Sequence, residues 1–143
     1  MITVSQILQE KDGNTWTIGP QATVLDALKL MADKGIGALV VVEAGKVVGI
    51  FSERDYARKV ILKGRSSKET PVSWIMTEQV ITVDPDTTVD VCMGLMTDRH
   101  IRHLPVMEND RLIGVISIGD VVKAVISEQK YLIEHLESYI VGR

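Results

Sequence analysis

Residues 20–55 read PQATVLDALKLMADKGIGALVVVEAGKVVGIFSERD, and residues 85–120 read PDTTVDVCMGLMTDRHIRHLPVMENDRLIGVISIGD. The two stretches align without a gap at an offset of about 65 residues, and self-similarity at a fixed period indicates that one unit has been duplicated. The register holds to the last positions, Asp55 and Asp120. A unit of this size buries too little apolar surface to be stable alone, so we expect the two copies to share a core.

Each copy begins with the pattern of an amphipathic helix. Apolar residues recur at i, i+3, i+4 and i+7, which is the spacing of one buried helix face. These residues are Val24, Ala27, Leu28 and Met31 in the first copy and Val89, Cys92, Met93 and Met96 in the second. We therefore expect one helix after Pro20 and another after Pro85.

A hairpin is predicted after each of these helices. Two β-branched runs separated by a polar or glycine-containing turn occur at 38–42 and 46–51, and again at 104–107 and 111–116. A short strand is expected before each helix, at 16–18 and 80–83, and a second helix is expected from Asp55 and Asp120. The predicted fold class is α/β (α+β), with the element order β-α-β-β-α occurring twice.

The repeat also predicts how the chain is divided. Residues 4–7 are similar to residues 72–75 at a slightly larger offset, which places a short surface insertion at 11–14. The polar segment 64–70 has the composition of an exposed linker. We therefore predict one boundary, between a first repeat at 1–66 and a second repeat at 67–143.

Composition narrows the class of protein. The 143 residues are 45% hydrophobic but only 4% aromatic, which predicts a core of aliphatic side chains. A net charge of -3 argues against general binding to nucleic acid or to anionic membranes. The single cysteine, Cys92, cannot form an internal disulfide, and the first residues lack the pattern of a signal peptide, so we expect a cytoplasmic protein.

Several short motifs follow one another in a fixed order. They are VSWIMT at 72–77, PDTTV at 85–89, a helix running into MTDRHIRHLPV at 96–106, and GVISIGD at 114–120. Repeated in register, they resemble a tandem pair of cystathionine-β-synthase (CBS) domains, also called a Bateman module. The resemblance covers almost the whole chain and is closest to short, stand-alone bacterial CBS-pair proteins. It implies two repeats related by a pseudo-twofold axis and packed sheet to sheet.

The resemblance also implies a function. CBS pairs bind adenosine-containing ligands such as AMP, ATP, NAD or S-adenosylmethionine in clefts between the repeats, and they usually sense rather than catalyse. For this chain AMP and NAD are the expected ligands, bound as regulatory molecules and not as catalytic cofactors. We further expect a homodimer and an unidentified protein partner that receives the signal.

The expected ligand residues lie where the second helix of each copy begins. Asp55 and Asp120 follow a strand that ends at Ser52 or Ser117, where a carboxylate can accept both ribose hydroxyls while the helix N-terminus faces a phosphate. A serine followed three positions later by an acidic residue is also an ordinary capping box, which needs no ligand. Both interpretations remain open, and one aspartate can serve both purposes.

The two predicted sites differ in charge, because in the family each aspartate is completed by residues of the other copy. The first site combines Ser52, Arg54 and Asp55 with Arg102 and His103, and its cations suit a phosphate. The second combines Ser117 and Asp120 with Gly37 and Ala38, without matching cations. Other ligand-binding positions are expected at Thr17, Thr82 and Pro105. Arg58 and Lys59 are interpreted as a solvated helix face, with phosphate screening or binding of an acidic partner as the alternative for either residue.

An enzyme is not expected, because the sequence contains no complete catalytic constellation. Cys92 falls on an apolar helix face and is interpreted as a small core residue. His100 and His103 have no further cysteine or histidine cluster near them, so no metal site is predicted. The alternative to a sensor is a ligand-independent dimeric scaffold for protein interactions.

A long apolar helix pattern ends the chain and has no counterpart in the first copy. It consists of Val121, Val122, Val125, Ile126, Leu132, Ile133, Leu136, Tyr139 and Ile140. This stripe either folds back on its own module or packs against a second chain. The sequence leaves both alternatives open.

Overall fold

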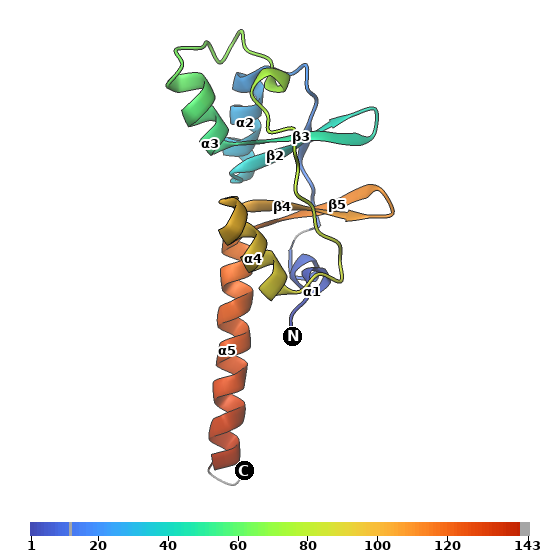
Figure 1. The fold of residues 1–143 in the computed structure, drawn as a ribbon, viewed down its shortest axis with the longest axis vertical. Helices are drawn as coiled ribbons and strands as arrows, with labels where there is room; N and C mark the ends of the chain where they lie inside the picture. Colours follow the sequence, from blue (N-terminus) through green and yellow to red (C-terminus); the bar gives the residue numbers. More distant parts are fainter. Residues whose placement is uncertain (12, 141–143) are drawn as a thin grey trace. The chain divides into compact units, whose positions relative to one another are not determined.

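The computed structural model describes residues 1–11 and 13–140, which form two compact units (Figure 1). The first-copy unit is Thr15–Ile81, and the second-copy unit combines Met1–Asn14 with Thr82–Arg143. Residue 12 of the predicted insertion and residues 141–143 of the predicted second repeat lie outside the described residues. Each unit contains a small sheet and helices, which confirms the mixed α/β fold.

The first-copy unit contains a three-stranded sheet in the order β1-β2-β3. Strand β1 (Thr17–Ile18) pairs in parallel with β2 (Ala38–Glu43), and β2 pairs antiparallel with β3 (Lys46–Ser52). The helical elements are α2 (Val24–Lys34), α3 (Glu53–Tyr56), the π-helical turn η1 (Ala57–Ile61) and the 3-10 turn η2 (Val72–Trp74). The elements predicted for the first copy are therefore confirmed, although its second helix is short and continues as a π turn.

The second-copy unit contains an antiparallel hairpin of β4 (His103–Glu108) and β5 (Arg111–Ser117). Its helices are α1 (Val4–Gln9), α4 (Val89–Arg99) and α5 (Ile118–Ile140). The strand predicted at 80–83 does not form in this described segment, where Val83 makes one isolated parallel bridge with Val106. The pairing does not extend as it does in β1 because the neighbouring residue of β4, Pro105, has no backbone N–H to donate.

Matching sequence signals start and end the first helix of each copy. Thr23 and Thr88 each accept a hydrogen bond from the backbone N–H three residues further on, at 3.1 and 3.4 Å. At the other end, Gly35 and His100 adopt the left-handed conformation, with φ of 65° and 56°. Both helices therefore turn into the following strand in the same way.

Both hairpins use the same turn. Their central residues all have positive φ, as a type I′ turn requires: 51° at Ala44, 78° at Gly45, 52° at Asn109 and 62° at Asp110. Each hairpin also has one register irregularity at the equivalent place in its first strand. The duplication is thus visible in the backbone as well as in the sequence.

The lead segments, defined as residues 2–8 and 70–76, each pack in the unit of the other copy. The second-copy unit has backbone hydrogen bonds from Val4 N to Thr87 O (2.8 Å) and from Val89 N to Ile2 O (2.9 Å). The first-copy unit has the matching pair from Val72 N to Ala22 O (2.8 Å) and from Val24 N to Thr70 O (2.9 Å). Each lead segment therefore supplies an acceptor for the first turn of a helix, whose N–H groups have no partner within the helix.

This exchange makes the compact units differ from the predicted repeats. The boundaries 1–66 and 67–143 describe repeats of sequence, whereas the units change over at Thr15 and Thr82. The predicted linker at 64–70 is exposed for most of its length, but Thr70 is buried and the carbonyl of Ser67 accepts from Leu25 N at 2.9 Å. The end of this segment is consequently part of the packed structure.

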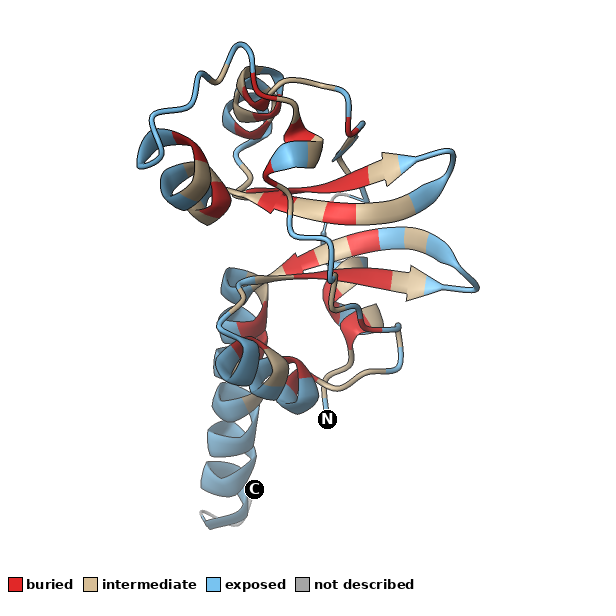
Figure 2. Ribbon diagram, turned by 45° about the horizontal axis from the view of Figure 1, so that its top comes forward, coloured by how far each residue is buried: buried red, intermediate tan, exposed pale blue. Residues whose placement is uncertain are grey.

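Each unit has a core that is mostly aliphatic, as predicted, with one buried aromatic side chain, Phe51, among the described residues (Figure 2). The first-copy core consists of Val24, Ala27, Met31, Leu39, Val41, Phe51, Val60, Val72 and Ile75. The buried side chains of the second-copy unit include Val4, Ile7, Val89, Cys92, Met96, Leu104, Val106, Ile116 and Val121. Burial raises the pKa of the Cys92 thiol, consistent with its predicted core position. The prediction for Met93 is wrong, because the buried row of α4 is narrower and leaves this side chain exposed.

Helix α5 has 23 residues and is buried only where it begins. Its buried residues are Val121 and Ala124, whereas every residue from Gln129 to Ile140 is exposed (Figure 2). The alternative in which the apolar stripe folds back on its own module is therefore not realised. Among the described residues, no helix has both the length and the apolar character needed to cross a membrane.

We predict that Gly49→Ala destabilises the protein because the lead segment 70–76 crosses β3 at this glycine. A Cβ atom at Gly49 would lie 2.5 Å from Met76 Sδ and 3.1 Å from the backbone oxygen of Thr77. That backbone is hydrogen-bonded to Ile50, so it cannot move freely. Forcing atoms into a packed site of this kind costs about 1–3 kcal/mol, measurable by urea unfolding.

Two glycines provide controls for this experiment. At Gly114, the equivalent position, the obstacle is the flexible end of Leu8 at 2.7 Å, so Gly114→Ala is expected to cost less. Gly94 lies in α4 with nothing within 4 Å of its position for a Cβ, so Gly94→Ala is expected to stabilise by about 1 kcal/mol. Equal stability of Gly49→Ala and the unmodified protein would contradict the prediction.

Candidate functional site

Asp55 forms a capping box at the junction of β3 and α3. Ser52 Oγ accepts from the Asp55 backbone N–H at 3.2 Å. In return, Asp55 Oδ2 accepts from the Ser52 backbone N–H at 3.0 Å and from its hydroxyl at 3.1 Å. The capping interpretation is therefore confirmed for this pair, and the same atoms hold the carboxylate in one orientation.

The other carboxylate oxygen of Asp55 has partners from two further elements. Thr77 Oγ1 donates to Oδ1 at 3.3 Å, and Lys59 Nζ lies 3.1 Å from the same oxygen. Lys59 also donates to the carbonyl of Ile75 at 3.1 Å. Only 9% of Asp55 is exposed, so these groups take the place of solvent around its carboxylate. The side chain of Lys59 is 43% exposed, so it is partly solvated and is also bound within its own unit.

Asp120 repeats this arrangement in the second-copy unit with a different cation. Asp120 Oδ2 accepts from the Ser117 backbone N–H at 2.8 Å, and Ser117 Oγ accepts from the Asp120 N–H at 3.2 Å. Lys11 Nζ lies 2.8 Å from Oδ2 and also donates to the carbonyl of Val115 at 2.8 Å. Ala124 occupies the position that corresponds to Lys59. The Asp120 junction thus has a cation from an unexpected segment, Lys11, although no cation stands at the positions Gly37 and Ala38 that match Arg102 and His103.

Lys11 and Ser117 determine the protonation of Asp120. Burial alone raises the pKa of this carboxyl, but the hydrogen bonds from Lys11 and Ser117 outweigh burial and hold the pKa below its ordinary value. The carboxylate is therefore ionised at neutral pH. Because the folded-state pKa is lowered, this group stabilises the fold above its unfolded-state pKa and loses that contribution as the pH falls through its folded-state pKa.

His103 lies in β4 opposite Ser117 and close to the same cluster. Burial lowers the pKa of its imidazole, the positive charge of Lys11 lowers it further, and the negative charge of Asp120 partly opposes both. The imidazole is therefore neutral at pH 7, which corrects its predicted role as a cation. In this state His103 is a hydrogen-bonding group, and Arg102 is the charged member of the pair.

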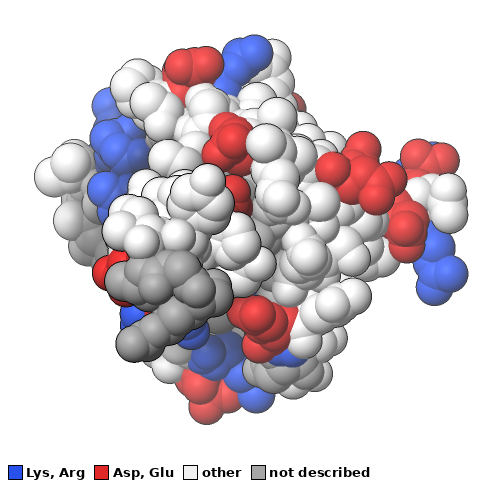
Figure 3. Space-filling view, turned by 90° about the horizontal axis from the view of Figure 1, so that it is seen from below, with Lys and Arg blue, Asp and Glu red and all other residues white. Residues whose placement is uncertain are grey.

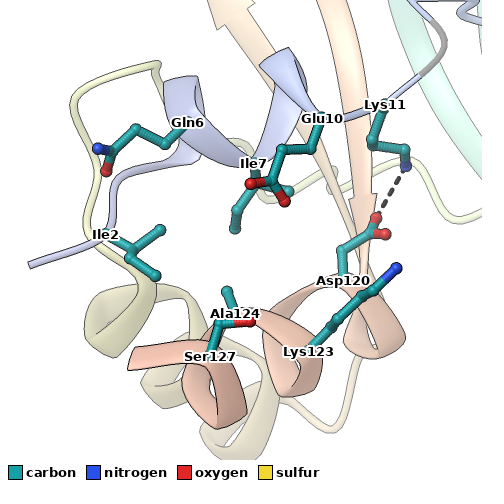
Figure 4. Close-up of a pocket in the computed structure, with 9 residues that line it drawn as sticks. All are labelled: Ile2, Gln6, Ile7, Glu10, Lys11, Asp120, Lys123, Ala124 and Ser127. Atoms are coloured by element: carbon teal, nitrogen blue, oxygen red, sulfur yellow. Dashed lines mark hydrogen bonds and ion pairs between the residues drawn. The ribbon is translucent and has the colours of Figure 1, made fainter. Parts of the chain in front are cut away.

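A cavity of about 230 Å³ lies beside Asp120, between α1 and α5 of the second-copy unit (Figure 4). Glu10 and Lys11 reach toward it from the α1 side, and Asp120 and Lys123 from α5. Its remaining lining residues are Ile2, Gln6, Ile7, Ala124 and Ser127. The Lys11–Asp120 ion pair thus lies at the edge of a small cavity lined by both apolar and charged side chains.

The other predicted residues divide between the two units. The carbonyl of Gly37 accepts from Glu53 N at 3.1 Å, and the carbonyl of Arg102 accepts from Ile118 N at 2.8 Å. Ala38 lies opposite Ser52 in the β2–β3 pair and is buried. Thus the first-copy unit brings Gly37, Ala38, Ser52, Arg54 and Asp55 to one junction, and the second-copy unit does so for Arg102, His103, Ser117 and Asp120.

Three predicted positions lie away from these junctions in their own units. Thr17 is exposed on β1, where it pairs with Val40. Thr82 is exposed before the bridge at Val83. Pro105 is buried within β4, and its carbonyl accepts from Val83 N at 3.0 Å. Among the described residues, none of the three forms a hydrogen bond or ion pair with Asp55 or Asp120, and their ligand-binding roles stay predictions.

Sequence reasoning missed Lys11, Lys59 and Thr77 as partners of the two aspartates. Lys59 carried a usable signal, because it stands four residues after Asp55 on a predicted helix. Lys11 carried none, since it is separated from Asp120 by 109 positions and lies in the insertion predicted to be on the surface. Thr77 reaches Asp55 only because the lead segment 70–76 packs in the first-copy unit.

The charges on the surface do not form an extended patch of one sign on the face shown in Figure 3. Acidic and basic side chains are interspersed there among larger uncharged areas. Together with the net charge of -3, this distribution gives no general attraction for a polyanion on that face. The attraction of an anion to this protein therefore depends on local cations such as Lys11 and Lys59 more than on the net charge.

Two copies of a small sheet, each with a capped aspartate where its last strand meets a helix, define a tandem-repeat α/β protein with one candidate carboxylate site per repeat. The CBS domain family model matches residues 2–62 and 72–127. The chain therefore belongs to the CBS-domain family, which confirms the resemblance found in the sequence.

Individual relatives agree with this assignment. The mitochondrial CBS domain-containing protein CBSX3 of Arabidopsis thaliana is 46% identical over 149 residues, covering 98% of this chain and 72% of that protein. The structure of a protein with CBS domains from Burkholderia ambifaria is 53% identical, with a TM-score of 0.86, covering 89% of this chain and 96% of that one. The name of the Arabidopsis relative gives no support to the predicted cytoplasmic location, which stays a prediction.

One of the solved relatives is a complex with adenosine-containing ligands. The CBS domain pair of protein MJ0100, in complex with 5′-methylthioadenosine and S-adenosyl-L-methionine, is 25% identical to this chain. Its TM-score is 0.79, and the match covers 90% of this chain and 98% of that one.

We predict that Lys11→Met raises the pKa of both Asp120 and His103. Removing the ammonium group removes the hydrogen bond that stabilises the carboxylate and the positive charge that disfavours the imidazolium. NMR titration of the two side chains measures both values. Lys123→Met is the matched control, because Lys123 also lines the cavity but contributes to neither pKa. Unchanged titration of both groups in Lys11→Met would refute this assignment.

Proposed function

We propose that the chain is a regulatory sensor that binds an adenosyl ligand through its two strand–helix junctions and signals to a partner protein. One observation carries the proposal most directly: an oriented aspartate stands at the same helix start in both units. Membership of the CBS family and the adenosyl ligands of the MJ0100 pair support the ligand class. AMP and NAD are the preferred candidates.

The chemistry of these junctions suits a ribose. A carboxylate held by Ser52 or Ser117 can accept hydrogen bonds from both hydroxyls of a ribose diol, which is a bidentate interaction with a charged acceptor. Such a ligand takes the place of donors that the carboxylate already has, Lys59 and Thr77 at Asp55 and Lys11 at Asp120. Binding therefore exchanges internal hydrogen bonds for ligand hydrogen bonds.

The phosphate of AMP or NAD requires positive charge as well. We assign this role to Arg54 and Arg102, with His103 contributing hydrogen bonds as a neutral imidazole. In this proposal Arg102 and His103 complete the site of Asp55, while Gly37 and Ala38 complete that of Asp120. Lys11 gives the Asp120 site a cation of its own, so both sites can hold an anionic ligand.

Ligand binding becomes a signal when it changes what the protein presents to a partner. A ligand that contacts groups of both repeats favours one arrangement of those repeats over others, by as much as its affinity for the two arrangements differs. We further propose that the signalling form is a homodimer located in the cytoplasm. A ligand-independent scaffold is the competing function, and it requires no exchange of partners at Asp55.

We predict that Asp55→Asn weakens nucleotide binding at the Asp55 site and leaves the Asp120 site intact. For a ligand with a Kd of about 10 µM, about 1 mM ligand stabilises the protein by about 2.7 kcal/mol, which is a clear rise in Tm. Loss of a charge-assisted hydrogen bond is expected to weaken binding about 10- to 100-fold. Isothermal titration and thermal shift with AMP, ATP, NAD, NADH and S-adenosylmethionine measure both effects.

The control for this variant is Asp26→Asn. Asp26 forms the same kind of capping box with Thr23 at the start of α2, but it is not a predicted ligand residue. Both variants weaken a helix cap, but only Asp55→Asn is expected to show a smaller ligand-induced rise in Tm. Equal responses of the two variants, or silence of the folded unmodified protein toward all five ligands, would favour the scaffold.

We predict that Arg102→Gln weakens AMP binding about 5- to 30-fold but leaves adenosine binding unchanged. Arg102 is exposed before β4, and its guanidinium is assigned to the phosphate, which adenosine lacks. Arg111→Gln, at the exposed hairpin turn, removes the same charge elsewhere and serves as the control. The assignment fails if Arg102→Gln affects adenosine and AMP equally.

A further inference from the structure

The C-terminal half of α5 presents apolar side chains to solvent without cover from the described part of the chain. The large apolar residues there include Leu132 (55% exposed), Ile133 (56%), Leu136 (50%), Tyr139 (81%) and Ile140 (78%). A helix gains most of its stability from packing an apolar face, and exposed apolar surface of this extent marks an interaction site. The question is what covers it.

The apolar stripe is a second face of α5 and not a continuation of the contact with its own unit. Val121 and Ala124 are the α5 residues buried in that contact. At about 100° per residue, the stripe is centred roughly 100° around the helix from this contact. The stripe also runs alongside the unit itself, where Ile118, Val122 and Ile126 are exposed. It therefore extends along the whole helix.

The stripe has the seven-residue spacing of a two-stranded coiled coil. The a positions are Ile126, Ile133 and Ile140, and the d positions are Val122, Gln129 and Leu136. Isoleucine at a, with leucine and valine at d, fits knobs-into-holes packing, and a single polar residue in the seam restricts the register. The pattern specifies a helical partner.

The two edges of the seam differ in chemistry. The e edge carries the charged residues Lys123, Lys130 and Glu137, and the g edge carries the apolar residues Val125, Leu132 and Tyr139. In a parallel pair each e edge meets the partner's g edge, so charges would face apolar side chains. In an antiparallel pair like edges meet, so the apolar edges bury each other and the charged edges remain together.

We propose that α5 packs antiparallel against α5 of a second copy of this chain. In the full-length register Val122 faces the partner's Ile140, Ile126 faces the partner's Leu136, and Gln129 faces the partner's Ile133. The stripe from residue 122 to residue 140 is then covered along its length. This interface does not depend on nucleotide binding.

The same register also matches both edges, which is why we assign a second copy and not an unrelated protein. It brings Lys123 to the partner's Glu137, Val125 to the partner's Tyr139, and Leu132 to the partner's Leu132. A stripe that binds a different protein does not require this internal complementarity. The one unfavourable contact is Lys130 with the partner's Lys130, where like charges meet at the twofold axis.

The first test measures self-association of the full chain by sedimentation equilibrium. The unmodified protein is expected to form a dimer at about 10 µM, and Ile133→Glu is expected to weaken the dimer at least about tenfold. Ser138→Glu introduces the same residue on the polar side of α5 and is expected to change nothing. Dimers of equal strength in Ile133→Glu, or an unmodified protein that stays monomeric at about 200 µM, would overturn the proposal. Circular dichroism melting confirms that each variant is folded.

The second test separates this interface from a dimer formed by other surfaces and fixes its direction. The double variant Val122→Cys with Ile140→Cys is expected to form disulfide-linked dimers on oxidation, because these positions face each other across the antiparallel pair. The single variant Ile133→Cys places cysteines together only in a parallel pair and is expected to remain unlinked. Cys92 is buried and serves as an internal negative control. Linking of Ile133→Cys would overturn the antiparallel register, because a parallel pair brings residues 122, 133 and 140 each to its own counterpart and so links both variants. Absence of both links would overturn the helix pairing.

The third test uses the like charges at the twofold axis. Lys130→Gln removes the repulsion without touching the apolar seam, so it is expected to tighten the dimer about two- to fivefold at low salt. The gain is expected to shrink at high salt, where the repulsion is screened. A weaker dimer in Lys130→Gln would contradict the proposed register.

Discussion

Each unit depends on backbone hydrogen bonds that a lead segment from the other repeat brings to a helix N-terminus. The first N–H groups of α2 and α4 have no acceptor within their helices, and the carbonyls of Thr70 and Ile2 fill this need at 2.9 Å. The lead segments also place Met76 against Gly49 of one hairpin and Leu8 against Gly114 of the other. The glycines leave room for these side chains. The helix, the hairpin and the lead segment of a unit therefore stabilise one another.

The sequence alone predicted the repeat, the hairpins and the helices because periodicity and turn residues are local signals. It did not predict the exchange of lead segments, because hydrogen bonds between backbone groups far apart in sequence leave no pattern in side chains. The same limit applies to the site: Ser52 and Asp55 were found from their spacing, whereas Lys11 meets Asp120 only through the packing of residues 1–14 in the second-copy unit. His103 was found, but its charge was not, because burial and neighbouring charges set its pKa.

The two aspartates combine a structural and a proposed chemical role in one group. Each carboxylate accepts from the serine that caps its helix, and each also forms an ion pair with a lysine, so its polar contacts lie largely within its own unit. A ligand at either junction gains affinity only by the difference between its own hydrogen bonds and those it replaces. Lys59 comes from the helix that Asp55 begins, whereas Lys11 comes from a distant segment, so replacing them loosens different parts of the protein.

The exchanged lead segments have a consequence for how such a protein arises. In a chain with one repeat, the lead segment would have no second repeat to complete, and two molecules would have to trade these segments to satisfy both helix N-termini. Assembly would then depend on how often two chains meet. Joining the repeats in one polypeptide replaces that encounter by a high effective concentration of each lead segment near its acceptor helix. Gene duplication thus converts an association between subunits into a folding step within a single molecule.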